Sequence, residues 1–134
     1  MFGDHTAGYG AVVEAAGVDH VRLGYQYLDH GDADGYESLL DVGAVLEEPG
    51  RERVCGRMAV AGARRQLRGR GEHDVHDVFA REGRVAAIGR FRPSGRGSGA
   101  VDFADIYTLS EHGLLVSQRS FYFVHPARSS RTET

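Results

Sequence analysis

The sequence predicts an α+β fold in which three N-terminal helices close a cone-shaped, curved antiparallel sheet. Apolar residues recur at helical spacing in the first half of the chain, whereas the second half carries long runs that alternate apolar and polar residues. Such segregation is typical of folds in which helices pack on one face of an antiparallel sheet. A curved sheet covered in this way encloses a deep apolar pocket, which is a usual place for a small ligand.

The composition indicates a single domain spanning residues 1–134. The hydrophobic fraction of 41% and the charged fraction of 26% are those of globular proteins, and the chain is long enough to bury one sizeable core. No apolar run approaches a membrane span, and a net charge of -3 argues against general nucleic-acid binding. Cys55 is the only cysteine and no signal peptide is evident, so we expect a cytoplasmic protein.

The first helix is expected at residues 20–29. Asp19 is typical of an N-cap, and apolar side chains follow at helical spacing: Val21, Tyr25 and Leu28. Residues 1–17 are rich in Gly and Ala and form either a mobile leader or a marginal helix. A second, short helix is expected at residues 35–41.

A third helix is expected at residues 57–67. Its pattern places four side chains inward, namely Met58, Val60, Ala61 and Leu67. Three arginines are then expected on its solvated face, namely Arg64, Arg65 and Arg68.

The strands are expected at residues 45–47, 72–79 and 85–92, and in a hairpin formed by Ala100–Val124. Turns lie at Glu82–Gly83 and Glu111–Gly113, where glycine supplies the backbone freedom that a turn needs. Large side chains lie on both faces of the last two strands, which predicts a homodimer that covers the second face. The polar tail, residues 127–134, is expected to be disordered.

The sequence predicts neither a metal site nor a cofactor. His73 and His76 are three apart on a strand and therefore point to opposite faces, so they cannot easily bind one ion. The glycine-rich segment at residues 95–99 lies between two strands, where no helix N-terminus is available for a phosphate.

Three ionisable side chains are the candidates for chemistry. Asp105 lies in mid-strand among apolar residues, so it either occupies the wet face of the sheet or lines a pocket. His73, on a strand face expected to include Asp77 and Phe79, is either an acid–base group or a surface histidine. Glu48 precedes Pro49 at a strand end, and is either a base at the pocket mouth or an exposed acid.

Two stretches of the chain carry a resemblance to a known superfamily. The first is GDADG at 31–35 followed by AVLEEP at 44–49, and the second is DIY at 105–107 followed by SEHG at 110–113. Their order and spacing resemble the nuclear-transport-factor-two-like superfamily, which includes ketosteroid isomerase, scytalone dehydratase and SnoaL-like polyketide cyclases. The resemblance covers roughly residues 19–125.

The resemblance implies roles for single residues. Glu48 falls at the proton-shuttling Asp of the isomerase, and Asp105 falls at its protonated Asp, a neutral donor in an apolar oxyanion hole. The isomerase's oxyanion Tyr falls at Gly24, so Tyr25 and Tyr27 are expected nearby but directed differently. His73, together with Asp77, resembles the strand histidine of the dehydratase.

The sequence therefore predicts a cofactor-independent acid–base enzyme for a small hydrophobic metabolite, in polyketide-like secondary metabolism. Glu48 or His73 would move a proton next to a carbonyl, and Asp105 would donate to the oxyanion, giving isomerisation, cyclisation or dehydration. A non-catalytic binding protein and an epoxide-opening enzyme remain open, because fold does not decide function. Substrate contacts are expected from Tyr25, Leu46, Ile88, Arg90, Phe103 and Tyr122. For Arg90 the alternative is an ion pair on the outer sheet face.

Overall fold

The structure, a computed structural model, describes residues 2–68, 71–95 and 99–123. It contains the helices α1 (Phe2–Asp29), α2 (Ala33–Ser38) and α3 (Arg57–Arg68). The strands are β1 (Leu40–Glu47), β2 (Val54–Cys55), β3 (Gly71–Arg81), β4 (Arg84–Pro93), β5 (Val101–Leu109) and β6 (Leu115–Phe123). The predicted tail at residues 127–134 lies outside the described residues.

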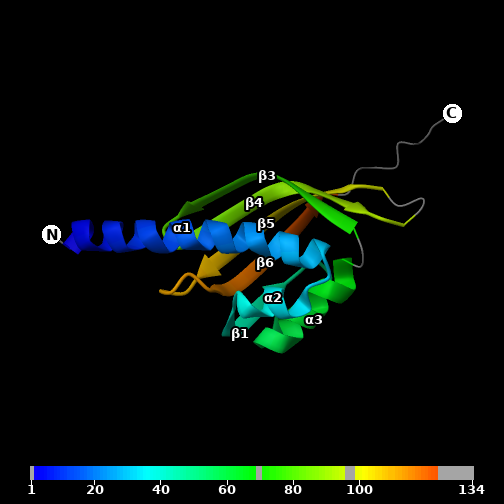
Figure 1. The fold of residues 1–134 in the computed structure, drawn as a ribbon, viewed down its shortest axis with the longest axis horizontal. Coiled ribbons are helices and arrows are strands. Elements are labelled where there is room, and N and C mark those ends of the chain that lie inside the picture. Colours follow the sequence, from blue (N-terminus) through cyan, green and yellow to red (C-terminus); the bar gives the residue numbers. More distant parts are fainter. Residues whose placement is uncertain (1, 69–70, 96–98, 124–134) are drawn as a thin grey trace.

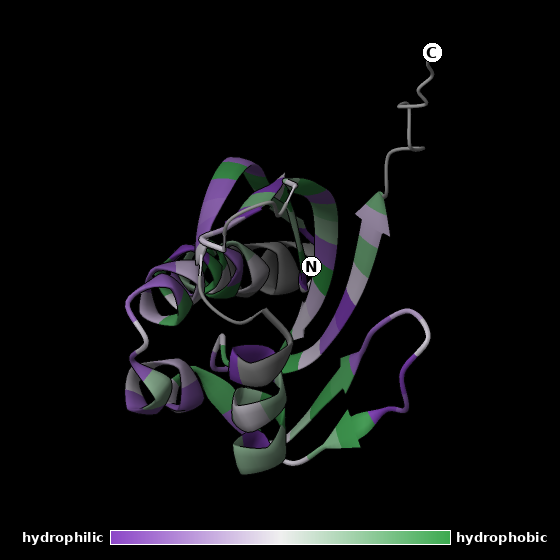
Figure 2. Ribbon diagram, turned by 90° about the vertical axis from the view of Figure 1, so that its right-hand side faces the viewer, coloured by the Kyte–Doolittle hydropathy of each residue, from purple (hydrophilic) through white to green (hydrophobic). Residues whose placement is uncertain are grey.

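The strands form one six-stranded sheet in the order β2-β1-β6-β5-β4-β3. Strand β1 pairs with β6 in parallel, and every other pairing is antiparallel. The sheet is curved and unclosed, and α1 crosses it with α2 and α3 alongside (Figure 1). Figure 2 shows the three helices gathered on one side of the curved sheet. The predicted α+β architecture is therefore confirmed. Within the described residues, no helix is both long and apolar enough to cross a membrane.

Helix α1 begins far before its expected start, and its middle packs on the hairpin of β5 and β6. Gly17 lies against Leu109 so closely that a Cβ atom at this glycine would overlap the leucine side chain. The His20 Nδ1 atom lies 2.7 Å from the carbonyl oxygen of Gly113, at the hairpin turn. Residues 2–17 are thus helical, and Asp19 lies inside the helix, so its assignment as an N-cap was wrong.

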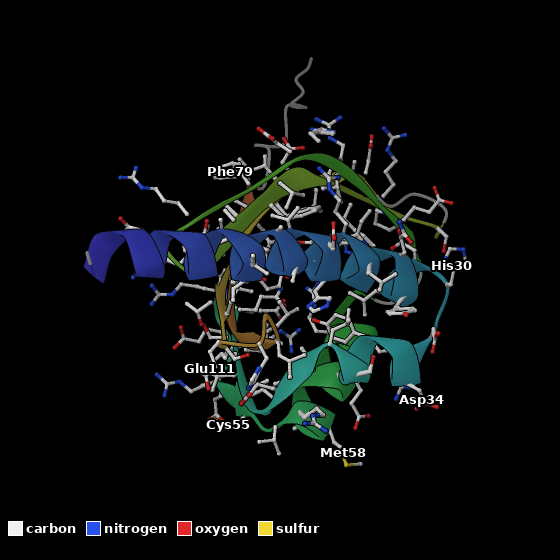
Figure 3. All side chains as sticks on the ribbon, turned by 60° about the vertical axis from the view of Figure 1, so that its left-hand side comes forward. His30, Asp34, Cys55, Met58, Phe79 and Glu111 are labelled. Atoms are coloured by element: carbon white, nitrogen blue, oxygen red, sulfur yellow. The ribbon has the colours of Figure 1, made fainter. Side chains whose placement is uncertain are left out.

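Helix α3 differs from expectation at two positions. Val60 and Ala61 are buried as predicted, but Met58 is 75% exposed and points away from the body of the molecule (Figure 3). Arg64 was expected on the solvated face, yet its side chain is fully buried. The buried stripe follows the helical spacing through Val60 and Arg64, so a polar side chain occupies a core position. Arg65 is exposed as expected, and the side chains of 66–68 are outside the described set.

A bulge in β3 changes which side chains face the interior. Val75 pairs with Gly89 of β4 and Asp77 pairs with Ile88, so His76 is an extra residue in the ladder. His73 and Val75 face inward before the bulge, whereas Asp77 is exposed after it. Phe79 is exposed as well, on the outer side of the sheet (Figure 3). The expectation that Asp77 and Phe79 share the face of His73 was therefore wrong.

Replacement of Gly89 by alanine tests the bulge. A Cβ atom at this position would overlap the carbonyl oxygen of Asp74 and stand 3.0 Å from the Cα atom of Val75. Backbone atoms cannot move aside cheaply, so we expect Gly89→Ala to lower the free energy of unfolding by about 1–3 kcal/mol in urea titrations. Gly62→Ala, in open space on α3, is the control and should raise that free energy by about 0.5–1 kcal/mol. Equal effects of the two substitutions would contradict the close approach.

Candidate active site

Asp105 lies at the centre of a buried polar cluster. Strict alternation along β5 turns Phe103, Asp105 and Tyr107 to the inner face, and the Asp105 side chain is fully buried. The Tyr25 hydroxyl of α1 donates a hydrogen bond of 2.6 Å to Asp105 Oδ2. Tyr107 in turn donates a hydrogen bond of 2.8 Å to the Tyr25 hydroxyl oxygen. Asp105 therefore lies on the pocket side of the sheet, and Tyr25 is directed at it, contrary to the expectation for that tyrosine.

Both tyrosines in this cluster are held in the neutral form. Burial, followed by the nearby negative charge of Asp105, raises the pKa of Tyr25 well above its usual value. Burial is also the largest cause of the raised pKa of Tyr107, and Asp105 adds to it. At neutral pH their hydroxyl groups are hydrogen-bond donors in a dry interior.

Arg64 brings a positive charge into the same cluster from α3. Its Nη2 atom lies 4.0 Å from Asp105 Oδ2, and both side chains have no exposed surface. Its Nε atom donates a hydrogen bond of 3.3 Å to the Tyr36 hydroxyl, which donates to Gln118 Oε1 at 3.3 Å. Gln118 then donates to the hydroxyl oxygen of Ser120 at 3.0 Å, so the polar network crosses from α3 to β6.

His73 is paired with an acid at the end of α1. Asp29 accepts hydrogen bonds from the backbone nitrogen of His73, at 2.9 Å, and its Oδ1 atom lies 2.5 Å from His73 Nδ1. The imidazole packs against Tyr25 and Phe91, with ring centroids 4.9 Å and 4.8 Å away. His73 is thus an interior residue whose acidic partner is Asp29, and the expected pairing with Asp77 was wrong.

Glu48 lies in the wall of a cavity at the open end of the cone. It directly follows β1, is 9% exposed, and accepts a hydrogen bond from the Tyr122 hydroxyl. The cavity has a volume of about 300 Å³. Its lining is formed by Glu48, Pro49, Arg51, Phe91, Pro93, Val101 and Tyr122. A carboxyl group here faces a mostly apolar space large enough for a small molecule.

The structure places the three candidate acid–base residues at two depths. In the described part of the chain, the lining of the Glu48 cavity includes neither Asp105 nor His73. Tyr122 lines the cavity and pairs with Phe103. Asp105, two residues further along β5, pairs with Ser120. Asp105 therefore lies one layer of side chains below the cavity, about 7 Å along the strand. His73 lies beside both layers through its contacts with Phe91 and Tyr25.

The expected substrate contacts divide between the two faces of the sheet. Tyr25, Phe103 and Leu46 lie in the interior, and Tyr122 lines the cavity. Ile88 is 42% exposed on the outer face of β4, where Arg90 Nε donates a hydrogen bond of 2.7 Å to Asp102. Alternation along β4 turns these two residues away from the interior, so the structure does not bring them to the site.

Sequence reasoning missed three residues of the interior. Tyr107 stands two residues after Asp105 and shares its strand face, as the alternation predicts, but it was given no role in the site. Arg64 stands four residues after the buried Val60, but its charge argued for an outward position. Asp29 contacts a residue 44 positions away, and nothing local signals that contact. Among the described residues, no cluster of three or more potential ligands could hold a metal ion.

Comparison with known protein families identifies the domain. The family model of the SnoaL-like domain matches residues 21–118, which is most of the chain. The chain belongs to the SnoaL-like domain family. The matched region begins within α1 at Val21 and ends within β6 at Gln118, so it includes Tyr25, Glu48, Arg64 and Asp105. A search of curated proteins finds no significant match.

Several solved structures share the fold of this chain. A putative ketosteroid isomerase from Kribbella flavida has a TM-score of 0.72 at 17% identity, covering 90% of each chain. An epoxide hydrolase from M. tuberculosis, described as LEH-like, has a TM-score of 0.64 at 19% identity, covering 82% of this chain and 84% of that one. A putative SnoaL-like polyketide cyclase from Shewanella denitrificans has a TM-score of 0.65 at 12% identity, covering 79% of this chain and 90% of that one. At these identities the likeness shows a shared fold.

The buried tyrosines predict a loss of stability at alkaline pH. An unfolded tyrosine ionises near pH 10, whereas Tyr25 and Tyr107 stay protonated in the folded protein, so the unfolded chain loses its protons first. Their contribution is fully present below about pH 10 and is lost as the pH rises, by about 1.4 kcal/mol per pH unit for each tyrosine. Urea titrations from about pH 8 to 11 measure it.

The variant Tyr107→Phe removes one of these two groups and is the comparison for that measurement. Its free energy of unfolding should fall less steeply above about pH 10 than that of the unmodified protein. Parallel curves for the two proteins would show that Tyr107 titrates normally in the fold.

Proposed function

We propose that this SnoaL-like domain is a cofactor-independent acid–base enzyme that acts on a small hydrophobic metabolite. The observation that carries the proposal is Glu48, a largely buried carboxyl group in the wall of an otherwise mostly apolar cavity. Proton abstraction next to a carbonyl is the reaction class, leading to isomerisation, cyclisation or dehydration in secondary metabolism of the polyketide type. The relatives named as an isomerase, a cyclase and an epoxide hydrolase share its fold.

Glu48 is the proposed proton-transfer residue. A general base must reach the substrate directly, and Glu48 is the carboxyl group on the wall of the 300 Å³ cavity. Tyr122 lines the same cavity, and the hydrogen bond that its hydroxyl donates fixes the orientation of the Glu48 carboxyl group. His73, positioned by Asp29, is the second candidate for this role, since its ring packs against the cavity residue Phe91.

The deeper cluster is proposed to stabilise negative charge on the substrate oxygen. Asp105, the donor that the resemblance implies, accepts the hydrogen bond of Tyr25 at its Oδ2 atom. We assign a donor role to the Tyr25 hydroxyl group as well, which stays protonated because burial raises its pKa and which would turn its single hydrogen bond from Asp105 to the substrate oxygen, while Tyr107 donates to Tyr25 and holds it in place. Donors fixed in a water-poor site stabilise an oxyanion more strongly than water does.

The substitution Glu48→Gln tests the proposed base. The probe is β-tetralone, an apolar ketone, in deuterated water, and the measurement is deuterium incorporation next to its carbonyl by NMR. Removal of a positioned base should slow this exchange by about 10²–10⁴-fold, while the affinity for the ketone, measured by calorimetry, changes little. Styrene oxide, assayed in parallel for hydration, tests the epoxide-opening alternative.

Glu47→Gln is the matched control for that substitution. Glu47 adjoins Glu48 but lies on the outer side, where it pairs with Arg53 at 3.1 Å and Arg119 at 3.3 Å. Its removal should leave the exchange rate unchanged. If Glu48→Gln exchanges at the unmodified rate while His73→Asn does not, the base is His73. If the unmodified protein binds the ketone and catalyses neither exchange nor hydration, a binding protein is favoured.

We also propose that the protein forms a cytoplasmic homodimer through the outer face of its sheet. Ile88, Ala104 and Phe121 are paired in register across β4, β5 and β6, and Phe121 is 42% exposed. Phe79 and Phe123 extend this face, and both are exposed. A row of exposed apolar side chains of this size is typical of an interface between subunits.

Sedimentation velocity of Phe121→Asp tests the dimer. A charge in the centre of an apolar interface should convert a dimer at micromolar concentration into a monomer, because the carboxylate would be buried without a partner. Val12→Asp is the control, since Val12 is an exposed apolar residue on α1, away from the sheet face, and this variant should remain dimeric. A monomeric unmodified protein would contradict the proposal.

A further inference from the structure

Arg64 is the most unusual buried group in the described structure. Its guanidinium group has no exposed surface, yet the only hydrogen bond that it makes to the described residues is the long one of 3.3 Å from Nε to the Tyr36 hydroxyl. Within the described residues, Nη1 and Nη2 have no hydrogen-bond partner. Asp105 is the nearest acid, and its Oδ2 atom is 4.0 Å from Nη2, beyond hydrogen-bond distance. Most of the five N–H donors of this arginine are therefore unused.

Burial of a guanidinium group in this state is costly. A charge removed from water must recover its hydration energy from partners, and unsatisfied buried donors destabilise the fold. An apolar side chain would fill this position on α3, between Val60 and the sheet, without that cost. The unused donors therefore need an acceptor that enters the interior from outside the chain.

The pattern of unused donors indicates what that acceptor is. Nη1 and Nη2 belong to the same guanidinium group and form the two-pronged end that binds both oxygens of one carboxylate. The Tyr25 and Tyr107 hydroxyl groups lie in the same cluster, but they already donate to Asp105 and to Tyr25, so the donors left for a ligand are those of the guanidinium group. A ketone oxygen or a water molecule would use only part of this set, whereas a carboxylate uses the whole end of the guanidinium group.

We propose that Arg64 is the receptor for a carboxylate group on the substrate, so that the ligand is a small apolar carboxylic acid. This inference rests on the proposed function in one respect, namely that the ligand body occupies the cavity beside Glu48. The cluster of Arg64 and Asp105 lies one layer of side chains below that cavity, so an acid that enters carboxylate first reaches Arg64 when the side chains of that layer move aside. Arg64 thereby fixes which carbon of the substrate faces Glu48.

Calorimetric titration with two matched probes tests this inference. The probes are β-naphthoate, which carries a carboxylate, and β-acetonaphthone, a neutral ketone on the same ring system. The unmodified protein should bind the carboxylate at least about tenfold more tightly than the ketone, because charge-assisted hydrogen bonds are the stronger ones. The melting temperature should rise more with the carboxylate than with the ketone.

Arg64→Lys is the decisive variant. It keeps a positive charge near Asp105, so the fold should survive, but it loses the two-pronged geometry that a carboxylate requires. Its affinity for β-naphthoate should fall at least about tenfold, while its affinity for β-acetonaphthone stays within about twofold. Arg65→Lys, at the exposed neighbouring position on the same helix, should change neither affinity.

The variant Asp105→Asn should change the affinity for β-naphthoate in the direction opposite to Arg64→Lys. Asp105 is the negative charge nearest to Arg64, so its neutralisation should tighten the binding of β-naphthoate. Equal affinity of the unmodified protein for the two probes, no binding of β-naphthoate at millimolar concentration, or an unchanged affinity in Arg64→Lys would each overturn the proposal. In those cases ordered water satisfies the guanidinium group.

The two proposals fail separately. Glu48→Gln should leave the affinity for β-naphthoate within about threefold, because Glu48 does not contact the carboxylate end of the ligand. Binding of the carboxylate through Arg64 without any proton exchange would reject the enzyme and keep the receptor. Proton exchange that depends on Glu48, with no preference for a carboxylate, would keep the enzyme and reject the receptor.

Discussion

The hydrogen bond between Tyr25 and Asp105 joins the helical layer to the sheet, and the interior is arranged around it. It links residues 80 positions apart, one near the C-terminal end of α1 and the other in the middle of β5. A carboxyl group at that depth requires partners, and Tyr25, Tyr107 and Arg64 surround it. The position of α1 across the sheet is thus fixed by polar contacts as well as by apolar packing.

That polar interior separates two environments within one cone. At the open end, Glu48 and Tyr122 line a mostly apolar cavity and are joined by a hydrogen bond, and this is where we propose that a proton is moved. One layer below, buried donors and a guanidinium group create a region suited to negative charge on a ligand. His73 and Asp29 connect the two layers, since the imidazole ring contacts both Phe91 and Tyr25. Such a division suits a substrate with one apolar and one acidic end.

Periodicity in the sequence was sufficient to predict most elements. The alternation of β4 to β6 and the turns at Glu82–Gly83 and Glu111–Gly113 gave the sheet, since side-chain period and turn chemistry are local properties. The start of α1 was placed too late, because residues 2–17 carry a weak apolar pattern and the contacts of the helix with the distant hairpin, at Gly17 and His20, are not visible in the sequence. The bulge at His76 was likewise not visible, since it depends on the approach of Gly89.

The sequence by itself determined the α+β architecture and indicated Glu48, His73 and Asp105 as candidates. Strand alternation and an acid before proline are local features of the sequence, so they can be recognised without the fold. The tertiary structure alone decided what each of these side chains touches. It showed that Arg64 is interior, that His73 pairs with Asp29, and that Tyr25 is directed at Asp105. These contacts join segments 41 to 80 residues apart, as for Arg64 and Asp105 or Tyr25 and Asp105, and the chemistry of a buried charge depends on neighbours that only folding brings together.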